Sequence, residues 1–225
     1  LGGLAGGTLI GLGCKENAIL VPGLALLAEA TLFRWRSSVP NAGRSLILLY
    51  CLSAGLPYLG AALVAVFWFD LWSTTYTHLD FTLGERLLTQ TRVVWWYLGQ
   101  VALPDASQMT FVHDDYRPSR GLLEPWTTAA GLAGLVAAAA VARWSMRFTP
   151  WLAFGLGWFA FAHSLEASIV PLELVYEHRN YVPSVGIAVG GVALAWQLLR
   201  RWAVSASVPV GVTVGVVTLL SLMTF

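Results

Sequence analysis

Seven apolar runs separated by short polar steps are the feature that most restricts how this chain can fold. The runs are residues 1–13, 18–33, 45–69, 125–142, 150–164, 184–199 and 208–225. A helix of about 20 residues crosses the hydrocarbon core of a bilayer. Charged residues make up 11% of the chain, whereas soluble domains carry about 25%. The sequence therefore predicts an all-α integral membrane protein, a single polytopic domain over residues 1–225 with about seven transmembrane helices.

Charge alternates between the connections of these runs. Three connections are basic and contain no acid: they hold Arg34, Arg36 and Arg44, then Arg143 and Arg147, then Arg200 and Arg201. The connections at residues 15–17, 70–124 and 165–183 hold eleven of the twelve Asp and Glu, all except Glu29. Basic loops stay in the cytoplasm. The acid-rich loops are therefore predicted to share the extracytoplasmic face.

This alternation predicts that three polar clusters, distant in the sequence, can meet on one side of the membrane. The clusters are "CKEN" at residues 14–17, "HDDYRPSR" at 113–120 and "YEHRNY" at 176–181. The simpler alternative is that these loops are polar only because they contact water. That alternative explains a single residue well, and three separate clusters less well.

The long loop at residues 70–124 contains a helical pattern over residues 84–103. Leu87, Val94, Tyr97, Leu98 and Val101 recur at helical spacing, with Arg86, Gln90 and Gln100 elsewhere. We expect an interfacial helix with Trp95, Trp96 and Tyr97 at headgroup depth. It is either an aromatic belt with no catalytic part or one wall of a groove for a lipid chain.

The segment that follows Pro104 carries His113, Asp114 and Asp115. Carboxylates beside a histidine hold a divalent cation or act as a general base. Consecutive loop residues point in different directions, however, and the spacing matches no tight metal signature. An ordinary solvated loop is the alternative. Asp114 and Asp115 are the catalytic candidates within this sequence.

The stretch "ELVYEHRNYVPSVG" at residues 173–186 places ionisable groups at the start of an apolar run. Pro183 suits the first turn of a helix, so we expect a helix to begin near residues 180–184. Free amide groups at a helix N-terminus attract anions. Arg179, His178 and Tyr181 add donors. This end of the helix is predicted to bind the phosphate of a lipid.

Lys15 stands before a second helix that begins on the same face, with Asn17 as its predicted N-cap. Lys15 and Arg179 are therefore expected to hold one phosphate from two sides. In the competing account, Lys15 pairs with Glu16 or Glu177 and only ties helices together.

Four segments then resemble a known family. "GLGCKENAILVP", "LLTQTRVVWWYLGQVALP", "LLEPWTT" and "SIVPLELVYEHRNYVPSVGIA" are similar, in order and spacing, to bacterial membrane proteins related to the TMTC mannosyltransferases. Those relatives often continue into tetratricopeptide repeats. The likeness runs from about Gly11 to Leu199, with Cys14 where the family more often has Ser.

The resemblance implies a GT-C type glycosyltransferase of the bacterial inner membrane. Such an enzyme moves a sugar from a polyprenyl-phosphate donor to an extracytoplasmic hydroxyl acceptor on a protein or glycan. The resemblance does not decide whether the reaction needs a divalent cation. The matching positions are Lys15, Glu16, Glu177, His178, Arg179 and Tyr181, assigned to phosphate binding and site architecture. Because the family's acidic catalytic motif lies in the first extracytoplasmic loop, we expect this chain to be an internal fragment that begins after it.

Two other classes stay open. A lipid-carrier transporter needs polar groups within the spans, where Glu29 and His163 are among few candidates. A structural or accessory subunit of a larger membrane assembly fits the small residues of 129–142, although it leaves the cluster around Arg179 unexplained.

The two cysteines, Cys14 and Cys51, are predicted to lie at opposite ends of the bilayer. The net charge of +1 gives no support to nucleic-acid binding.

Overall fold

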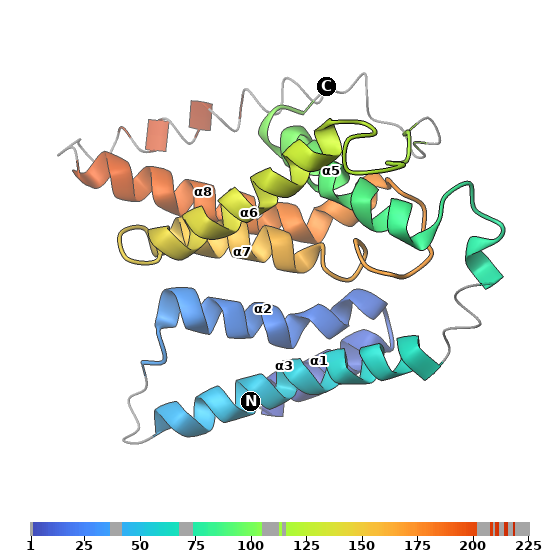
Figure 1. Ribbon diagram of the computed structural model, residues 1–225. Coiled ribbons are helices and arrows are strands. Elements are labelled where there is room, and N and C mark those ends of the chain that lie inside the picture. The colour runs from blue at the N-terminus through green and yellow to red at the C-terminus, as the bar shows by residue number, and fades with distance from the viewer. Residues whose placement is uncertain are drawn as a thin grey trace.

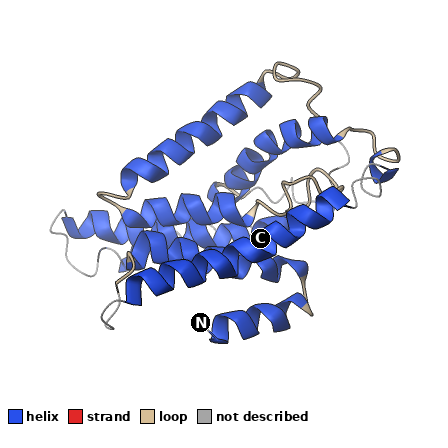
Figure 2. Ribbon diagram, turned by 60° about the horizontal axis from the view of Figure 1, so that its bottom comes forward, coloured by secondary structure: helices blue, strands red, loops and turns tan. Residues whose placement is uncertain are grey.

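The computed structural model describes residues 2–36, 42–67, 74–104, 113 and 116–201, and residues 208, 210, 211, 214, 215 and 218 (Figure 1). Within these residues every regular element is a helix (Figure 2). The elements are α1 (Gly2–Leu12), the 3-10 turn η1 (Glu16–Leu20), α2 (Val21–Ala28), the π-helical turn η2 (Glu29–Phe33), α3 (Ala42–Phe67), α5 (Leu83–Ala102), α6 (Thr127–Ser145), α7 (Pro150–Ala162), the 3-10 turn η4 (Glu177–Asn180) and α8 (Tyr181–Arg201). The all-α prediction is confirmed for these parts of the chain.

Three continuous helical segments are long and apolar enough to cross a membrane: Glu16–Phe33, Thr127–Ser145 and Glu177–Arg201. The apolar helices α1 and α7 are shorter, with 11 and 13 residues. Most of the last predicted run, 208–225, lies outside the described residues. The count of seven crossings therefore stays a prediction.

The helices pack side by side, with α2 between α3 and α7 (Figure 1). Glycines allow α7 and α8 to approach closely. A Cβ added at Gly190 would lie 2.8 Å from both the Cα of Gly155 and the carbonyl oxygen of Trp151. Helices in membranes pack through such small residues because dispersion contacts between close backbones drive their association. The α7–α8 pair is the framework on which the loops at one end are built.

Helix α5 forms where the pattern at residues 84–103 predicted it, and Val94 and Tyr97 are buried as expected, but the first half of its buried face is polar. The helix begins with a capping box: the backbone of Glu85 donates to the Thr82 hydroxyl, and the Glu85 carboxylate accepts from the backbone of Thr82 at 2.8 Å. These bonds lower the pKa of Glu85. Arg86 and Gln90, predicted to lie away from the packed face, are buried, and Leu87 is 41% exposed.

The physical reason is hydrogen bonding rather than hydrophobicity. Arg86 and Gln90 donate to backbone carbonyls of the loop that follows α7. A buried carbonyl without a donor costs free energy, so the polar side of α5 packs against that loop. The aromatic residues are held inside the fold as well: Trp95 Nε1 donates to the Gly131 carbonyl of α6 at 2.9 Å, and Tyr97 is 3% exposed.

The basic and the acid-rich connections gather at opposite ends of the helices. At the basic end, Arg34 Nη2 donates to the Met146 carbonyl at 2.8 Å, and Arg201 Nη2 donates to the Phe148 carbonyl at 3.2 Å. At the other end, Asn17 contacts Glu166 and His113 contacts Glu177. His113 of the second cluster therefore contacts the third directly, whereas the first cluster reaches the third through Glu166, which pairs with Arg179. Lys15 and Arg179 lie at the same end of the fold.

Candidate functional site

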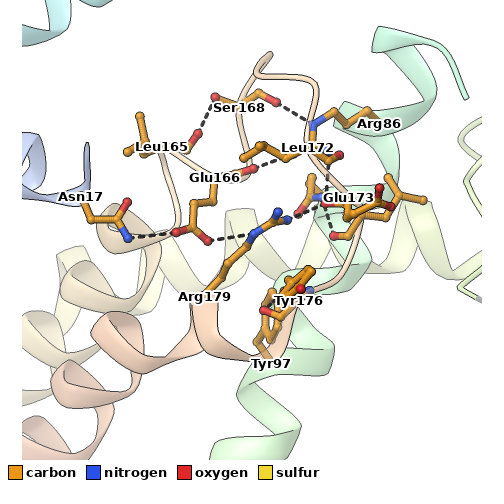
Figure 3. Close-up of polar contacts among 12 residues, drawn as sticks. Asn17, Arg86, Tyr97, Leu165, Glu166, Ser168, Leu172, Glu173, Tyr176 and Arg179 are labelled. Atoms are coloured by element: carbon orange, nitrogen blue, oxygen red, sulfur yellow. Dashed lines mark hydrogen bonds and ion pairs between the residues drawn. The ribbon is translucent and has the colours of Figure 1, made fainter. Parts of the chain in front are cut away.

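The loop at residues 163–176, which joins α7 to η4, is held in place by Arg86 (Figure 3). This guanidinium is fully buried. It donates to the carbonyl oxygens of Glu166 at 2.8 Å and Ser168 at 3.1 Å, and also to that of Leu172. A guanidinium carries five donors in a fixed fork. One side chain of α5 therefore sets the path of this loop.

Tyr97 links the same helix to the end of the loop. Its hydroxyl donates to the Tyr176 carbonyl at 3.0 Å and accepts from the Tyr176 amide at 2.8 Å. Burial raises the pKa of Tyr97 to about 12, so the hydroxyl keeps the proton that it donates. The Tyr97 carbonyl accepts from the Asn180 side chain at 3.0 Å. The start of α8 is thereby tied to the middle of α5.

Arg179 is paired with Glu166 inside this network. Arg179 Nε lies 3.5 Å from Glu166 Oε2, and the two side chains are 10% and 12% exposed. Arg179 Nη1 also donates to the Glu173 carbonyl at 2.5 Å, and the guanidinium lies 5.3 Å from the centre of the Tyr176 ring. The other carboxylate oxygen, Glu166 Oε1, accepts from Asn17 Nδ2 at 3.0 Å (Figure 3).

Glu166 is the anion that Arg179 binds in the structure, where the sequence predicted a lipid phosphate. Burial raises the pKa of Glu166, against the hydrogen bond from Asn17 and the positive charges of Arg179, His178 and Lys15. The carboxylate of Glu166 therefore already interacts with Arg179 and Lys15, the two cations that were expected to bind one phosphate together. Phosphate binding by Arg179 would require this ion pair to open.

A second carboxylate of the same region faces the long loop. Glu177 Oε1 lies 3.1 Å from His113 Nε2, and the side chains are 32% and 12% exposed. His113 also packs edge-on against Trp96, with ring centres 4.9 Å apart. An imidazole bonded to a carboxylate is the pairing used in general acid–base chemistry. The contact joins residues 64 positions apart in the sequence.

Glu177 lines a pocket of about 390 Å³ between α5 and the start of α8, called the polar pocket below. Its lining includes Trp96, His178, Asn180 and Tyr181. Tyr181 is 78% exposed. A carboxylate, an imidazole, an amide and two aromatic rings surround this space, a combination suited to a hydroxylated ligand such as a sugar. Of the predicted site residues, the pocket unites Glu177, His178 and Tyr181.

An apolar groove of about 550 Å³ lies on another side of α5, between this helix, α6 and α7. Val94, Trp95 and Leu98 of α5 line it. Buried His163 also lines it. Helix α5 is therefore a wall of both the apolar groove and the polar pocket. That the groove holds a lipid chain stays a prediction.

The remaining predicted residues lie apart from the polar pocket. Lys15 and Glu16 are exposed at the start of η1. Asn17 is not an N-cap, because it lies inside η1, where Lys15 takes the cap position without a side-chain bond. Its amide nitrogen donates to Glu166. Within the described ranges, Lys15 has no ion pair with Glu16 or Glu177.

The two catalytic candidates Asp114 and Asp115 lie outside the described residues. Over the described positions, no group of three or more His, Cys, Asp or Glu side chains is arranged to hold a metal ion.

Sequence reasoning missed Arg86 and Glu166 as parts of this end of the molecule. Each carried a signal. Arg86 lies within a helical pattern whose other buried positions are mostly uncharged, and Glu166 directly follows an apolar run. Ionisable groups at such positions are costly unless partnered, so both predicted a partner. Nothing in the sequence identified which one.

No protein-family model matches the chain, and no curated protein or solved structure matches it. The similarity to the TMTC-related proteins therefore stays a prediction from the four motifs.

Proposed function

We propose that this chain is part of a membrane glycosyltransferase of GT-C type. It transfers a sugar from a polyprenyl-phosphate donor to a hydroxyl acceptor at the extracytoplasmic face of the bacterial inner membrane. We further propose that the chain crosses this membrane about seven times, with α5 at the outer interface.

The observation that supports the proposal is the position of α5 between two unlike cavities. The apolar groove on one side suits a lipid chain, and the polar pocket on the other suits a sugar. A lipid-linked sugar has both chemistries in one molecule. Lys15, whose charge acts on Glu166 at the same end of the fold, is an exposed cation for the phosphate of the donor.

In this proposal Glu177 is the general base. Its carboxylate, oriented by His113, removes the proton of the acceptor hydroxyl. The acceptor oxygen then bonds to the anomeric carbon of the sugar while the bond from that carbon to the phosphate oxygen breaks. The electron pair of that bond leaves with the lipid phosphate, and the proton remains on Glu177.

A structural or accessory subunit is the second candidate. It is favoured by the internal use of both arginines at this end, since Arg86 and Arg179 bond to the chain itself. In that case the network only shapes a surface, and the base is supplied by another part of a larger assembly.

The test is sugar transfer by membranes that contain the full-length protein, with a panel of polyprenyl-phosphate hexoses as donors. We expect Glu177→Gln to lower kcat at least about 100-fold, the typical contribution of a positioned base. Glu124→Gln, at an exposed carboxylate of the same set of loops, is the matched control and should keep wild-type activity.

Equal activity of Glu177→Gln and Glu124→Gln would remove Glu177 from the mechanism. Wild-type membranes that transfer no hexose from any donor would favour the accessory subunit.

Lys15→Ala should raise KM for the donor, because the donor phosphate loses a cation. The variant should still fold, because Lys15 is exposed.

A further inference from the structure

A third cavity lies at the basic end of the fold, beside the last turns of α8. It has a volume of about 920 Å³. Its floor is apolar and aromatic, with Trp151, Val192 and Trp196, and it ends at Arg200 and Arg201. Since α8 rises about 1.5 Å per residue, this end lies about 30 Å from the polar pocket at Tyr181. The cavity is therefore separate from the proposed sugar site.

The length of this groove matches one leaflet of a bilayer. It runs along α8 from Ala188 to Arg201, which is about 20 Å of helix. Half of a bilayer, headgroups included, is about 20–22 Å thick. An acyl chain lying along the apolar floor would place its headgroup beside the two arginines.

The two arginines at the end of the groove have N–H groups that can bind a phosphate. The guanidinium of Arg200 lies 4.8 Å from the centre of the Trp196 ring, and in the described part of the chain it has no hydrogen bond or ion pair. Arg201 uses Nη2 for the Phe148 carbonyl, which leaves its other donors. A guanidinium fork matches the geometry of a phosphate.

Among the residues that the structure describes, no Asp or Glu forms an ion pair with Arg200 or Arg201. Residues 143–149 and 200–207 contain no Asp or Glu. The 143–149 connection carries Arg143 and Arg147, which are exposed and do not line the groove. Basic pockets between helices at this end of membrane proteins attract anionic lipids.

We propose that this groove binds an anionic phospholipid of the adjoining leaflet, with one acyl chain on the floor of α8 and the phosphate on Arg200 and Arg201. This site is independent of the transferase proposal. The lipid acts here as a bound component of the fold and not as a substrate.

The test is native mass spectrometry of the full chain, released from detergent and titrated with phosphatidylglycerol or with phosphatidylcholine of the same acyl chains. We expect phosphatidylglycerol to bind about 30-fold more tightly, as two arginines near a membrane surface imply. The double variant Arg200→Gln/Arg201→Gln should lose this preference. The matched control, Arg143→Gln/Arg147→Gln, removes the same charge outside the groove and should keep it.

A further variant tests the groove itself. Val192→Trp fills the apolar floor without changing any charge, and it should weaken phosphatidylglycerol binding at least tenfold. Circular dichroism and melting temperature verify that each variant folds. Equal binding of both lipids by the wild type, equal losses in the two double variants, or full binding by Val192→Trp would each overturn the proposal.

Discussion

Arg86 illustrates how a single residue decides the shape of the candidate site. It is a cation buried without a close carboxylate, held by backbone carbonyls of the 163–176 loop. Its cost of burial is offset because most of its donors find carbonyls that would otherwise be unsatisfied. The loop in turn carries Glu166, the partner of Arg179. Arg86 therefore acts on the site from a distance, as a positioning residue.

We predict that Arg86→Met lowers the free energy of unfolding by about 3 kcal/mol, because several carbonyls lose their donor. Arg86→Lys should cost about half as much, since a lysine keeps the charge and fewer donors. Thermal unfolding in detergent micelles measures both. The control is Arg117→Met, at an exposed arginine; a melting temperature as low as that of Arg86→Met would contradict the assigned role.

At the scale of elements, the contact between α7 and α8 depends on glycines that face each other. Gly190 meets Gly155 and the backbone of Trp151 at distances that leave no room for a methyl group, whereas the neighbouring Gly191 has open space around its Cβ position. The two glycines are consecutive, so they offer a matched comparison within one helix.

Gly190→Ala should lower the free energy of unfolding by about 1–3 kcal/mol, because the helices must separate to admit the methyl group. Gly191→Ala should leave it unchanged or raise it by about 0.5–1 kcal/mol, since alanine restricts the unfolded chain more than glycine does. The measurement is again the melting temperature in micelles. If Gly190→Ala were as stable as Gly191→Ala, the close helix contact would not exist in solution.

The element scale also shows where periodicity misleads. The apolar positions of α5 correctly predicted a helix near residues 84–103, but the buried face contains Arg86, Thr89 and Gln90. Hydrophobic periodicity assumes that a helix buries its apolar side. Here the neighbouring element is an irregular loop with carbonyls to satisfy, so polar side chains in the first half of α5 are buried along with Val93, Val94 and Tyr97.

At the scale of the whole molecule, the alternation of basic and acid-rich connections corresponds to two ends of one helical fold. Cys14 lies exposed at the acid-rich end and Cys51 lies within α3; they are the two cysteines of the chain. From the positive-inside rule, we expect the acid-rich end to face away from the cytoplasm. Cys14 can therefore be labelled chemically to test on which side of the membrane this end lies.

In a Cys51→Ser background, we expect a membrane-impermeant maleimide to label Cys14 on intact cells. Arg143→Cys, in a background with both native cysteines changed to serine, should react only after the membrane is permeabilised. The readout is the mass shift of the purified protein. Labelling of both positions from the same side would overturn the proposed orientation and, with it, the extracytoplasmic site.

The sequence by itself determined the all-helical class, the approximate positions of the helices, the start of α8 near Pro183 and the separation of polar connections into two groups. These follow from local chemistry, because apolar run length, proline geometry and charge distribution act on neighbouring residues. Only the tertiary structure decided that Glu166 pairs with Arg179, that His113 meets Glu177 and that Arg86 is buried against the 163–176 loop. These partners lie 13, 64 and 80 positions apart, and several donors compete for each acceptor. The choice among them depends on how the helices pack, which no local pattern records.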